Sequence, residues 1–507
     1  MNTLPGKPVS FWLDSTAETS FPPIQNVTVD VAVVGAGIAG ITAAYLLKKA
    51  GKKVALIEAE KVAANASGHT TAKVTSLHQL IYNDLLDKIG KEKAKLYGES
   101  NEAGVEFVAN TVQELGIDCD FSRRATYSFA ESEKNLDKVK KEYEAAVELG
   151  LPAEFVTETT LPFEIAGAVK FNNQAQFHVR KYLLHLVNLI DGDGSYVFEN
   201  SRVETVEEGE PCRVVSFEGT LQATDVLLTT HLPIMDQGLF FAKSYPQRSY
   251  IIGATIPEDK APEGMYIGVS ENYHSIRTTP KEDGKVLLLI GGGGHKVGSK
   301  SDTETSYEDL ESYANTHFGI PKEQIEYRWS SQDYKSFDRL PYIGKLTPAN
   351  NHIYVATGFS LWGMSKGTMA GMLLSDLVQG KENPWADLYD SLRATPFATT
   401  KSIQNNLDVG KHWVGDRLKG LDKWSPDAVN PGEGKIITYK GEKVGVYKND
   451  AGEVTAVNAT CPHLGCIVNW NSAEKTWDCP CHGGRFSCEG KVLQAPAVKD
   501  LEPKALS

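Results

Sequence analysis

The stretch that determines the fold runs from Val27 to Glu60 and reads VTVDVAVVGAGIAGITAAYLLKKAGKKVALIEAE. An apolar run, Val29 to Val34, leads into a glycine-rich turn. An amphipathic segment follows, and a second apolar run, Val54 to Ile57, ends at Glu58. Because the hydrophobic period changes from that of a strand to that of a helix and back, the stretch predicts a βαβ unit.

The turn in this unit has the pattern of a dinucleotide site. Gly35, Gly37 and Gly40 give the spacing G-x-G-x-x-G, which makes a tight turn, lets the backbone approach a pyrophosphate and lets the helix pack closely. The free N–H groups of the helix start point at the pyrophosphate. Glu58 is placed to accept a hydrogen bond from a ribose hydroxyl. The strand before the turn and the helix after it favour a bound dinucleotide over an empty turn, and both FAD and NAD remain open.

Length and composition set limits on the rest. A chain of 507 residues predicts two or three domains. The net charge of −13 disfavours nucleic acid or an anionic membrane as the main partner. The first twenty residues lack the features of a signal peptide, and no apolar run reaches about 18 residues, so we expect a cytoplasmic protein without a membrane span. Five of the seven cysteines lie in the last fifty residues, which indicates one specialised site.

Further strands follow the first unit. DVLLTT (225–230) and HIYVATG (352–358) continue an α/β sheet, whereas QRSYIIGAT (247–255) and KVLLLIGGGG (285–294) predict a separate, more antiparallel sheet. The glycines of the last run do not predict a second dinucleotide site, because a polar loop rather than an amphipathic helix follows them. They indicate a strand that passes close to another backbone.

Three segments carry a resemblance to a known family. HIYVATGFSLWGMSKGTMAGMLLSDLV (352–378) resembles the closing flavin segment of the D-amino-acid oxidase and glycine oxidase superfamily. FDRLPYIG (337–344) resembles the Asp-x-x-Pro-x-Ile-Gly stretch of that family, and NASGHTTAKV (65–74) stands where the family has its flavin loop. The resemblance covers residues 28–385 and implies FAD, with the N-terminus of the last helix at the flavin carbonyl edge. It adds Ser67, His69, Thr70, Gly358 and Gly363 to the expected cofactor-binding residues.

His69 is a candidate for a covalent link to the flavin. In relatives that oxidise dimethylglycine or sarcosine, a histidine in this loop can be tethered to FAD. His69 lies at about that offset, although the residues around it differ. The alternative is a histidine that is hydrogen-bonded beside the flavin.

The C-terminal cysteines and histidines form a second motif. Cys461-x-His463 is followed after fifteen residues by Cys479-x-x-His482. Such a set could hold zinc, but its order is not that of a zinc finger. The segment CPHLGCIVNW…WDCPCHGGRF resembles a Rieske [2Fe–2S] domain over residues 427–507. The resemblance implies that the two cysteines hold one iron and the two histidines the other.

The Rieske resemblance has two finer implications. Cys466 and Cys481 match the pair that forms a disulfide in the cytochrome bc subclass, which Rieske oxygenases lack. We also find no 2-His-1-carboxylate set for an oxygenase iron. Gly484 and Phe486 stand where high-potential Rieske proteins have a serine and a tyrosine that donate hydrogen bonds to sulfur. We therefore expect a redox potential below the top of the Rieske range, about +300 mV, and expect the substitutions Gly484→Ser and Phe486→Tyr to raise it.

Together these features predict an α/β fold with three parts and a linker. A Rossmann-like FAD-binding domain would comprise residues 28–90, 165–235 and 330–385. An inserted α+β substrate domain with a mostly antiparallel sheet would comprise 91–164 and 236–329. Residues 386–426 would form a linker or strapping helix, and 427–507 a small all-β Rieske domain.

The combination implies a function. FAD accepts two electrons and a [2Fe–2S] centre carries one, so the pair can convert a two-electron oxidation into single-electron steps. The whole arrangement resembles bacterial FAD-dependent oxidoreductases of the glycine/D-amino-acid oxidase type with a C-terminal Rieske domain. The resemblance implies a dehydrogenase that oxidises a small amine or amino acid and passes electrons to an external acceptor. An oxidase that uses O2, an electron-transfer protein charged by an outside reductase and a degenerate scaffold are the alternatives. The intact glycines and Glu58 argue against the last.

Substrate residues are less marked in the sequence. Arg248 and Tyr250 could clamp a carboxylate, since arginine makes bidentate hydrogen bonds to carboxylates. Trp362 and Lys366 lie in the loop that closes the flavin site. A purely structural role explains each of these four residues equally well.

Overall fold

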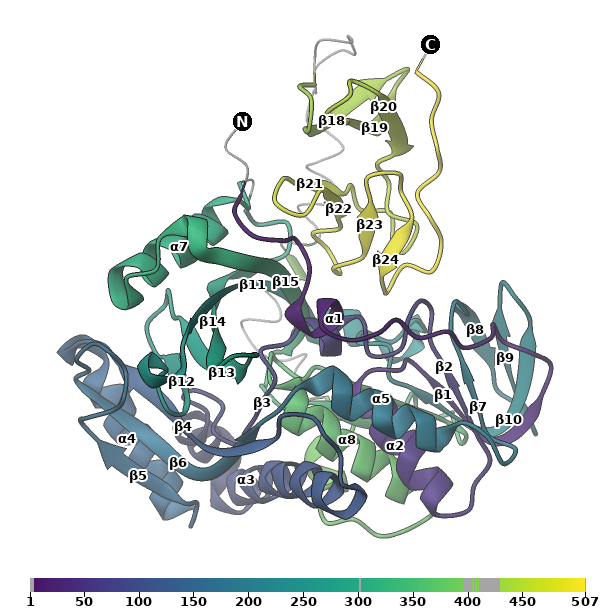
Figure 1. Ribbon diagram of the computed structural model, residues 1–507. Coiled ribbons are helices and arrows are strands. Elements are labelled where there is room, and N and C mark those ends of the chain that lie inside the picture. Colours follow the sequence, from purple (N-terminus) through teal and green to yellow (C-terminus); the bar gives the residue numbers. More distant parts are fainter. Residues whose placement is uncertain are drawn as a thin grey trace.

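The computed structural model describes residues 4–300, 302–394, 404, 406–407, 409 and 429–506. Within these residues the strands form two large sheets and two small ones (Figure 1). Most of the predicted linker, 386–426, lies outside the described residues; its first part contains α9 (Ala386–Tyr389). None of the helices in the described part of the chain has both the length and the apolarity needed to cross a bilayer.

The first large sheet is the predicted Rossmann-like sheet. Its eight strands run in the order β16-β17-β10-β1-β2-β7, with β9 paired to β10 and β8 paired to β9. The pairs among β17, β10, β1, β2 and β7 are parallel, and the rest are antiparallel. The strands are β1 (Thr28–Val34), β2 (Val54–Ile57), β7 (Tyr196–Phe198), β8 (Val203–Glu207), β9 (Cys212–Ser216), β10 (Thr220–Leu228), β16 (Tyr342–Lys345) and β17 (Ile353–Thr357).

Both faces of β1 are buried, because helices cover one face and the β8–β9 hairpin packs on the other. Val31 and Val33 pack with α2 (Ile38–Lys49), α5 (Val179–Ile190) and α8 (Gly363–Val378), whereas Ala32 and Val34 pack with β8 and β9. A strand buried on both faces has a continuous apolar sequence, as Val31 to Val34 has.

The second large sheet has nine strands in the order β15-β11-β14-β13-β12-β4-β6-β3, with β5 beside β6. All its pairs are antiparallel except β12 with β4. The strands are β3 (Lys73–Val74), β4 (Ser122–Ala130), β5 (Ala153–Val156), β6 (Gly167–Gln176), β11 (Ser244–Pro257), β12 (Met265–Gly268), β13 (Ser275–Pro280), β14 (Lys285–Lys296) and β15 (Ile325–Ser336).

The glycine run of β14 is a strand that passes close to another backbone, as the sequence indicated. A Cβ on Gly292 would lie 2.9 Å from the carbonyl oxygen of Tyr273. Flanking this sheet are α3 (Tyr82–Leu115), α4 (Leu136–Glu148) and α7 (Thr305–Phe318). The remaining short elements are α1 (Phe11–Asp14), α6 (Phe240–Lys243), η1 (Ala66–His69), η2 (Glu133–Asn135), η3 (Asp236–Gly238), η4 (Glu258–Lys260) and η5 (Lys322–Gln324).

Strand pairing places three segments differently from the predicted domain ranges. β3, β6 and the part of β15 from residue 330 onward pair within the second sheet, whereas the sequence predicts residues 28–90, 165–235 and 330–385 for the FAD-binding domain; the domain ranges themselves stay a prediction. The physical reason is the hydrogen-bond ladder: β15 pairs with β11 from Ser244↔Ser336 to Ala254↔Ile325, and β6 pairs with β4. Apolar patterns identify strands but do not say which sheet they join.

The C-terminal part is all-β, as predicted. One small sheet holds β18 (Gly434–Tyr439), β19 (Glu442–Lys448) and β20 (Val454–Asn458); the other holds β21 (Asn469–Asn471), β22 (Thr476–Asp478), β23 (Arg485–Ser487) and β24 (Val492–Gln494). In Figure 1 these strands stand above the two large sheets, and the end of β24 points down onto them.

Candidate active site

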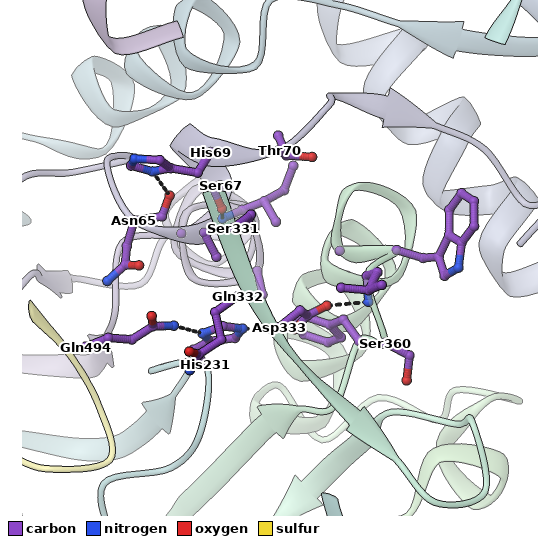
Figure 2. A pocket seen from close by; sticks show the side chains of 18 of the residues that line it. Asn65, Ser67, His69, Thr70, His231, Ser331, Gln332, Asp333, Ser360 and Gln494 are labelled. Atoms are coloured by element: carbon purple, nitrogen blue, oxygen red, sulfur yellow. Dashed lines mark hydrogen bonds and ion pairs between the residues drawn. The ribbon is translucent and has the colours of Figure 1, made fainter. Parts of the chain in front are cut away.

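A cavity of about 760 Å³ lies where the three parts of the chain meet. Its walls come from the β1–α2 turn, from the second sheet, from the loop before α8 and from the C-terminal residues around β24 (Figure 2). The volume lies in the upper part of the range of cofactor sites, about 300–1,000 Å³. Gly40 and Gly358 are not among its lining residues. The predicted cofactor residues that do line it are Gly35, Gly37, Glu58, Ser67, His69, Thr70 and Gly363.

The end of the cavity at the β1–α2 turn fits a dinucleotide. Glu58 lies at the end of β2, and its carboxylate accepts a hydrogen bond from the N–H of Ala36 at 2.9 Å. The hydroxyl of Ser67 accepts one from the N–H of Ile38 at 3.0 Å. A Cβ on Gly37 would meet only this hydroxyl, at 3.2 Å, so the glycine keeps the backbone open toward the cavity. Burial raises the pKa of Glu58, and the backbone N–H groups of Ala36 and Glu60 that donate to its carboxylate oppose this rise.

His69 faces this cavity from η1. Its Nδ1 lies 3.0 Å from the carbonyl oxygen of Asn65 (Figure 2), and burial lowers its pKa, which favours the neutral ring. The indole N–H of Trp329 donates to the His69 carbonyl at 3.0 Å, and that of Trp12 donates to the Thr70 carbonyl at 2.7 Å. These bonds fix the loop against the cavity, while a covalent link from His69 to FAD stays a prediction.

The loop that closes the site carries backbone strain. Ser360 and Leu361 have φ values of 57° and 72°, which non-glycine residues rarely adopt. The Asp333 carboxylate accepts a hydrogen bond from the N–H of Leu361. The N-terminus of α8 follows directly and lines the cavity, so its partial positive charge is available to a reduced flavin. Strain of this kind is concentrated at ligand sites.

Three of the four substrate candidates line the cavity: Tyr250, Trp362 and Lys366. The Tyr250 hydroxyl lies 3.0 Å from Nε2 of His295. Lys366 is fully buried, and burial, followed by the charge of Arg339, lowers its pKa to about 7. Near neutral pH a substantial fraction of this lysine is therefore an uncharged amine that can accept a proton.

Arg248, the fourth candidate, is not among the residues that line the cavity. Its side chain is buried, and its Nη2 lies 3.3 Å from the Asp478 carboxylate in the C-terminal domain. Its other bonds run to the Ser330 hydroxyl at 2.8 Å and to Oε1 of Gln332 at 3.0 Å. The carboxylate that Arg248 meets is thus an internal one.

Arg339 lines the cavity, and the sequence reasoning missed it as a site residue. Its Nη1 donates to the Leu80 carbonyl at 2.8 Å and lies 3.4 Å from Asp84. Its φ of 68° marks another strained position. The signal was present, because Arg339 lies inside the segment 337–344 that resembles the flavin family.

Two cysteines and two histidines meet at the other site. The rings of His463 and His482 lie 5.0 Å apart, and the Nδ1 atom of each is buried without a hydrogen-bond partner in the described part of the chain. Burial and the neighbouring His463 lower the pKa of His482 to about 3, and the hydrogen bond with the Cys461 thiol lowers the pKa of Cys479. Two unpaired ring nitrogens beside an easily ionised thiol fit the ligand set of a [2Fe–2S] centre.

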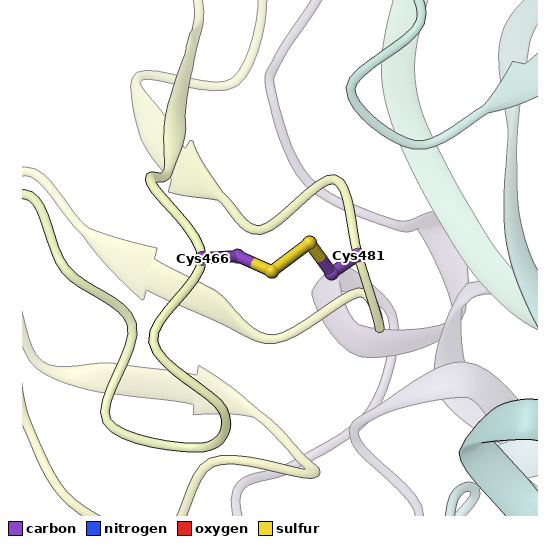
Figure 3. The surroundings of a disulfide bond; sticks show 2 residues. All are labelled: Cys466 and Cys481. Carbon is purple, nitrogen blue, oxygen red and sulfur yellow. A yellow bond between two sulfur atoms is a disulfide. The ribbon is translucent and has the colours of Figure 1, made fainter. Parts of the chain in front are cut away.

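The predicted disulfide is present. Cys466 and Cys481 are bonded, with 6.4 Å between their Cα atoms, and join the two loops that carry the other four residues (Figure 3). The sulfur of Cys479 lies within 4.8 Å of both disulfide sulfurs. Because a disulfide is not a thiolate, this leaves Cys461 and Cys479 as the available sulfur ligands.

Gly484→Ser is expected to raise the reduction potential of the cluster. A Cβ at this position would lie 3.7 Å from the Cys461 sulfur and 3.6 Å from Ala497, so a hydroxyl fits beside the sulfur. A hydrogen bond of about 1.4 kcal/mol to the reduced form shifts a one-electron potential by roughly 60 mV. A redox titration measures the shift, and Gly484→Ala, which adds the carbon without the hydroxyl, serves as the control. A rise in both variants would contradict the hydrogen-bond explanation.

The C-terminal domain forms part of the cavity wall. The Gln494 amide nitrogen lies 2.7 Å from Nδ1 of His231, whose Nε2 lies 2.9 Å from Asp333 (Figure 2). The Asn65 amide donates to the Leu493 carbonyl at 3.5 Å. β24 therefore covers the cavity next to the residues that fit the dinucleotide.

β15 connects the cavity with the cysteine–histidine site. The Tyr334 hydroxyl donates to the His482 carbonyl at 2.8 Å, and the Gln332 amide donates to the Gly483 carbonyl at 2.8 Å. The Tyr334 carbonyl accepts from the N–H of Ser360 in the closing loop at 3.0 Å. Tyr334 thus joins the closing loop of the cavity to the cluster loop, beside the contact that Gln332 makes. No sequence pattern identifies it, because 148 residues separate Tyr334 from His482.

Comparisons with known proteins agree with this geometry. Residues 30–377 match the family DAO, FAD dependent oxidoreductase, and residues 424–503 match the Rieske [2Fe-2S] domain. The chain is 37% identical over 500 residues to the putative Rieske 2Fe-2S iron-sulfur protein YhfW of Bacillus subtilis, covering 98% of this chain and 97% of that protein. It is 22% identical to gamma-glutamylputrescine oxidoreductase of Escherichia coli, over 75% of this chain and 90% of that one. Among solved structures, glycine oxidase from Geobacillus kaustophilus superposes with a TM-score of 0.59 at 21% identity, over 74% of this chain and 99% of the other.

Proposed function

Since this chain belongs to the DAO family of FAD dependent oxidoreductases and carries a C-terminal Rieske [2Fe-2S] domain, we propose that it is a dehydrogenase for a small amine or amino acid. Its two cofactors supply complementary chemistry, because FAD takes up two electrons with a hydride and the cluster carries one. The proposed route runs from the substrate through both cofactors to an external one-electron acceptor.

The observation that carries this proposal is the link through Tyr334. Its carbonyl accepts a hydrogen bond from Ser360 in the loop that closes the cavity, and its hydroxyl donates a hydrogen bond to the His482 carbonyl. Electron transfer through protein weakens steeply with distance, so a short, bonded and well-packed connection favours transfer within one chain. A Rieske domain that docked elsewhere would not support this route.

The residues around the cavity favour a substrate with a carboxylate and an amine. All hydrogen bonds from the Arg339 guanidinium to described residues run through Nη1, which leaves its other nitrogens for a carboxylate. Lys366 can accept the proton that the substrate nitrogen releases, because its pKa is lowered to about 7. The Escherichia coli relative is named for gamma-glutamylputrescine, which supports a nitrogen-containing substrate.

An anaerobic reduction experiment tests the proposal. Purified protein is mixed with a panel of amines and amino acids, and the absorbance of flavin and cluster is followed with time. We expect one class of compound to bleach the flavin first and the cluster spectrum to change afterwards. If none of the compounds acts while a reduced ferredoxin reduces the protein, the chain is an electron-transfer protein. If air alone restores the flavin rapidly and the cluster never changes, it is an oxidase.

Arg339→Gln is expected to lower kcat/KM for the active compound by about 10–150-fold, mainly through KM. The reason is the loss of a charge-assisted hydrogen bond worth about 1.5–3 kcal/mol. Steady-state kinetics with an artificial acceptor measures it. Arg213→Gln, which changes an exposed arginine on β9, is the control and should leave both constants unchanged. An equal effect on compounds with and without a carboxylate would show that Arg339 does not recognise the substrate carboxylate.

A further inference from the structure

The outer edge of the two cluster histidines is covered by a segment from outside the Rieske domain. Oδ1 of Asp236, in η3, lies 2.9 Å from Nε2 of His463. The ring of Phe241, in α6, packs edge-on against both histidines, at 5.9 Å from His463 and 5.0 Å from His482. The side chain of His463 is only 6% exposed as a result.

We propose that Asp236 is an outer hydrogen-bond partner of the cluster, which the flavin part of the chain supplies to hold the reduction potential down. The inference goes beyond the proposed function, because it applies whatever compound reduces the protein. Asp236 is a positioning and tuning residue that acts through His463.

The two nitrogens of His463 have separate partners in this arrangement. Nδ1 is buried and has no partner in the described residues, so it is the nitrogen left for iron. The hydrogen then resides on Nε2, which donates it to the Asp236 carboxylate. A carboxylate in this position fixes the tautomer and ring orientation and makes the imidazole a stronger electron donor to the metal.

The sign of the effect follows from charge. Reduction adds an electron to the cluster, and a nearby negative charge disfavours that step. The hydrogen bond from His463 therefore stabilises the oxidised form relative to the reduced form. Phe241 strengthens the effect, because it keeps water from the imidazole edges, and charges interact more strongly where water is excluded.

Because of this contact, the reduction potential of the cluster also depends on the docking of the Rieske domain against the flavin part of the chain. Asp236 and His463 are 227 residues apart in the chain, and only the docked arrangement brings them together. A Rieske domain on its own would have water at this edge. Docking against Asp236 therefore lowers the reduction potential of the cluster without any change within the Rieske domain itself.

Replacing Asp236 tests the inference by redox titration of the intact protein, with dithionite, mediators and the EPR signal of the cluster as the readout. We expect Asp236→Asn to raise the midpoint potential, such that the oxidised-to-reduced ratio at a fixed applied potential falls about tenfold, which corresponds to about 59 mV for one electron. Asp236→Glu should restore most of the wild-type value. Asp259→Asn is the matched control and should have no effect on the potential. Asp259 lies in η4, beyond the end of β11, and is roughly 30 Å along that strand from Arg248, the β11 residue that contacts the C-terminal domain.

An unchanged or lowered potential in Asp236→Asn with a full iron content overturns the inference. If that variant loses iron, Asp236→Ser is titrated instead, since it removes the carboxylate and leaves room for water. Loss of the cluster in both variants also contradicts the inference, because an outer hydrogen bond tunes a cluster and is not required to assemble it. None of these measurements uses a substrate, so failure of the dehydrogenase proposal in the reduction panel would leave them unaffected.

Discussion

Arg248→Met is expected to lower the free energy of unfolding by about 3–5 kcal/mol, because it leaves a buried carboxylate without its main partner. Arg248 and Asp478 are 1% and 7% exposed and lie 3.3 Å apart. Burial alone would raise the pKa of Asp478, but the charges of Arg248 and then Arg485 hold this pKa below its usual value. The stabilisation is therefore present at neutral pH and is lost as the pH falls below about 4, through the depressed pKa.

Urea denaturation at pH 7, followed through the cluster absorbance, measures this loss. Arg213→Met removes a pair with Glu207 in which both side chains are about half exposed, and should cost no more than about 1 kcal/mol. The double variant Arg248→Met/Asp478→Asn should recover part of the loss, since it removes the unpaired charge as well. A single variant as stable as the wild type would mean that water reaches Asp478 and that the two domains are not firmly docked.

Gly40→Ala is expected to weaken FAD binding at least tenfold. A Cβ at this position would lie 2.0 Å from the carbonyl oxygen of Gly35, and this oxygen belongs to the backbone of the turn. Gly35 itself has a φ of 103°, so the turn cannot easily take another shape. The start of α2 would have to move away from β1, and with it the N–H groups that face the cavity.

The flavin-to-protein ratio of purified Gly40→Ala should fall at least tenfold, which corresponds to about 1.4 kcal/mol or more of binding free energy. The iron content should stay near that of the wild type, because the cluster site lies in another domain. Gly219→Ala is the control: its added Cβ would meet only ordinary contacts of 3.4 and 3.5 Å in a turn before β10. Full flavin content in Gly40→Ala would show that the close packing of α2 on β1 is dispensable.

Local patterns in the sequence predicted the parts of this protein that depend on local spacing. The β1–α2–β2 unit follows from apolar runs and glycines within one short stretch, and the Rieske resemblance rests on two short loops. The disulfide between Cys466 and Cys481 came from that resemblance and is confirmed. The class of fold and both cofactors are confirmed on the same basis.

Contacts across domains could not be predicted in this way. The sequence shows that Arg248 lies on a strand, but not that Asp478 of another domain comes to meet it. The charge of an arginine suits an internal carboxylate as well as a substrate carboxylate, and only the packing decides between them. The same holds for Asp236 and Tyr334, whose partners lie 227 and 148 residues away along the chain.

β24 makes cofactor binding and domain docking depend on each other. Its residues Leu493 and Gln494 form part of the wall of the cavity, next to the residues that fit a dinucleotide. A cofactor that contacts both parts of the chain binds the docked arrangement better than the undocked one, so FAD and the C-terminal domain stabilise each other's position.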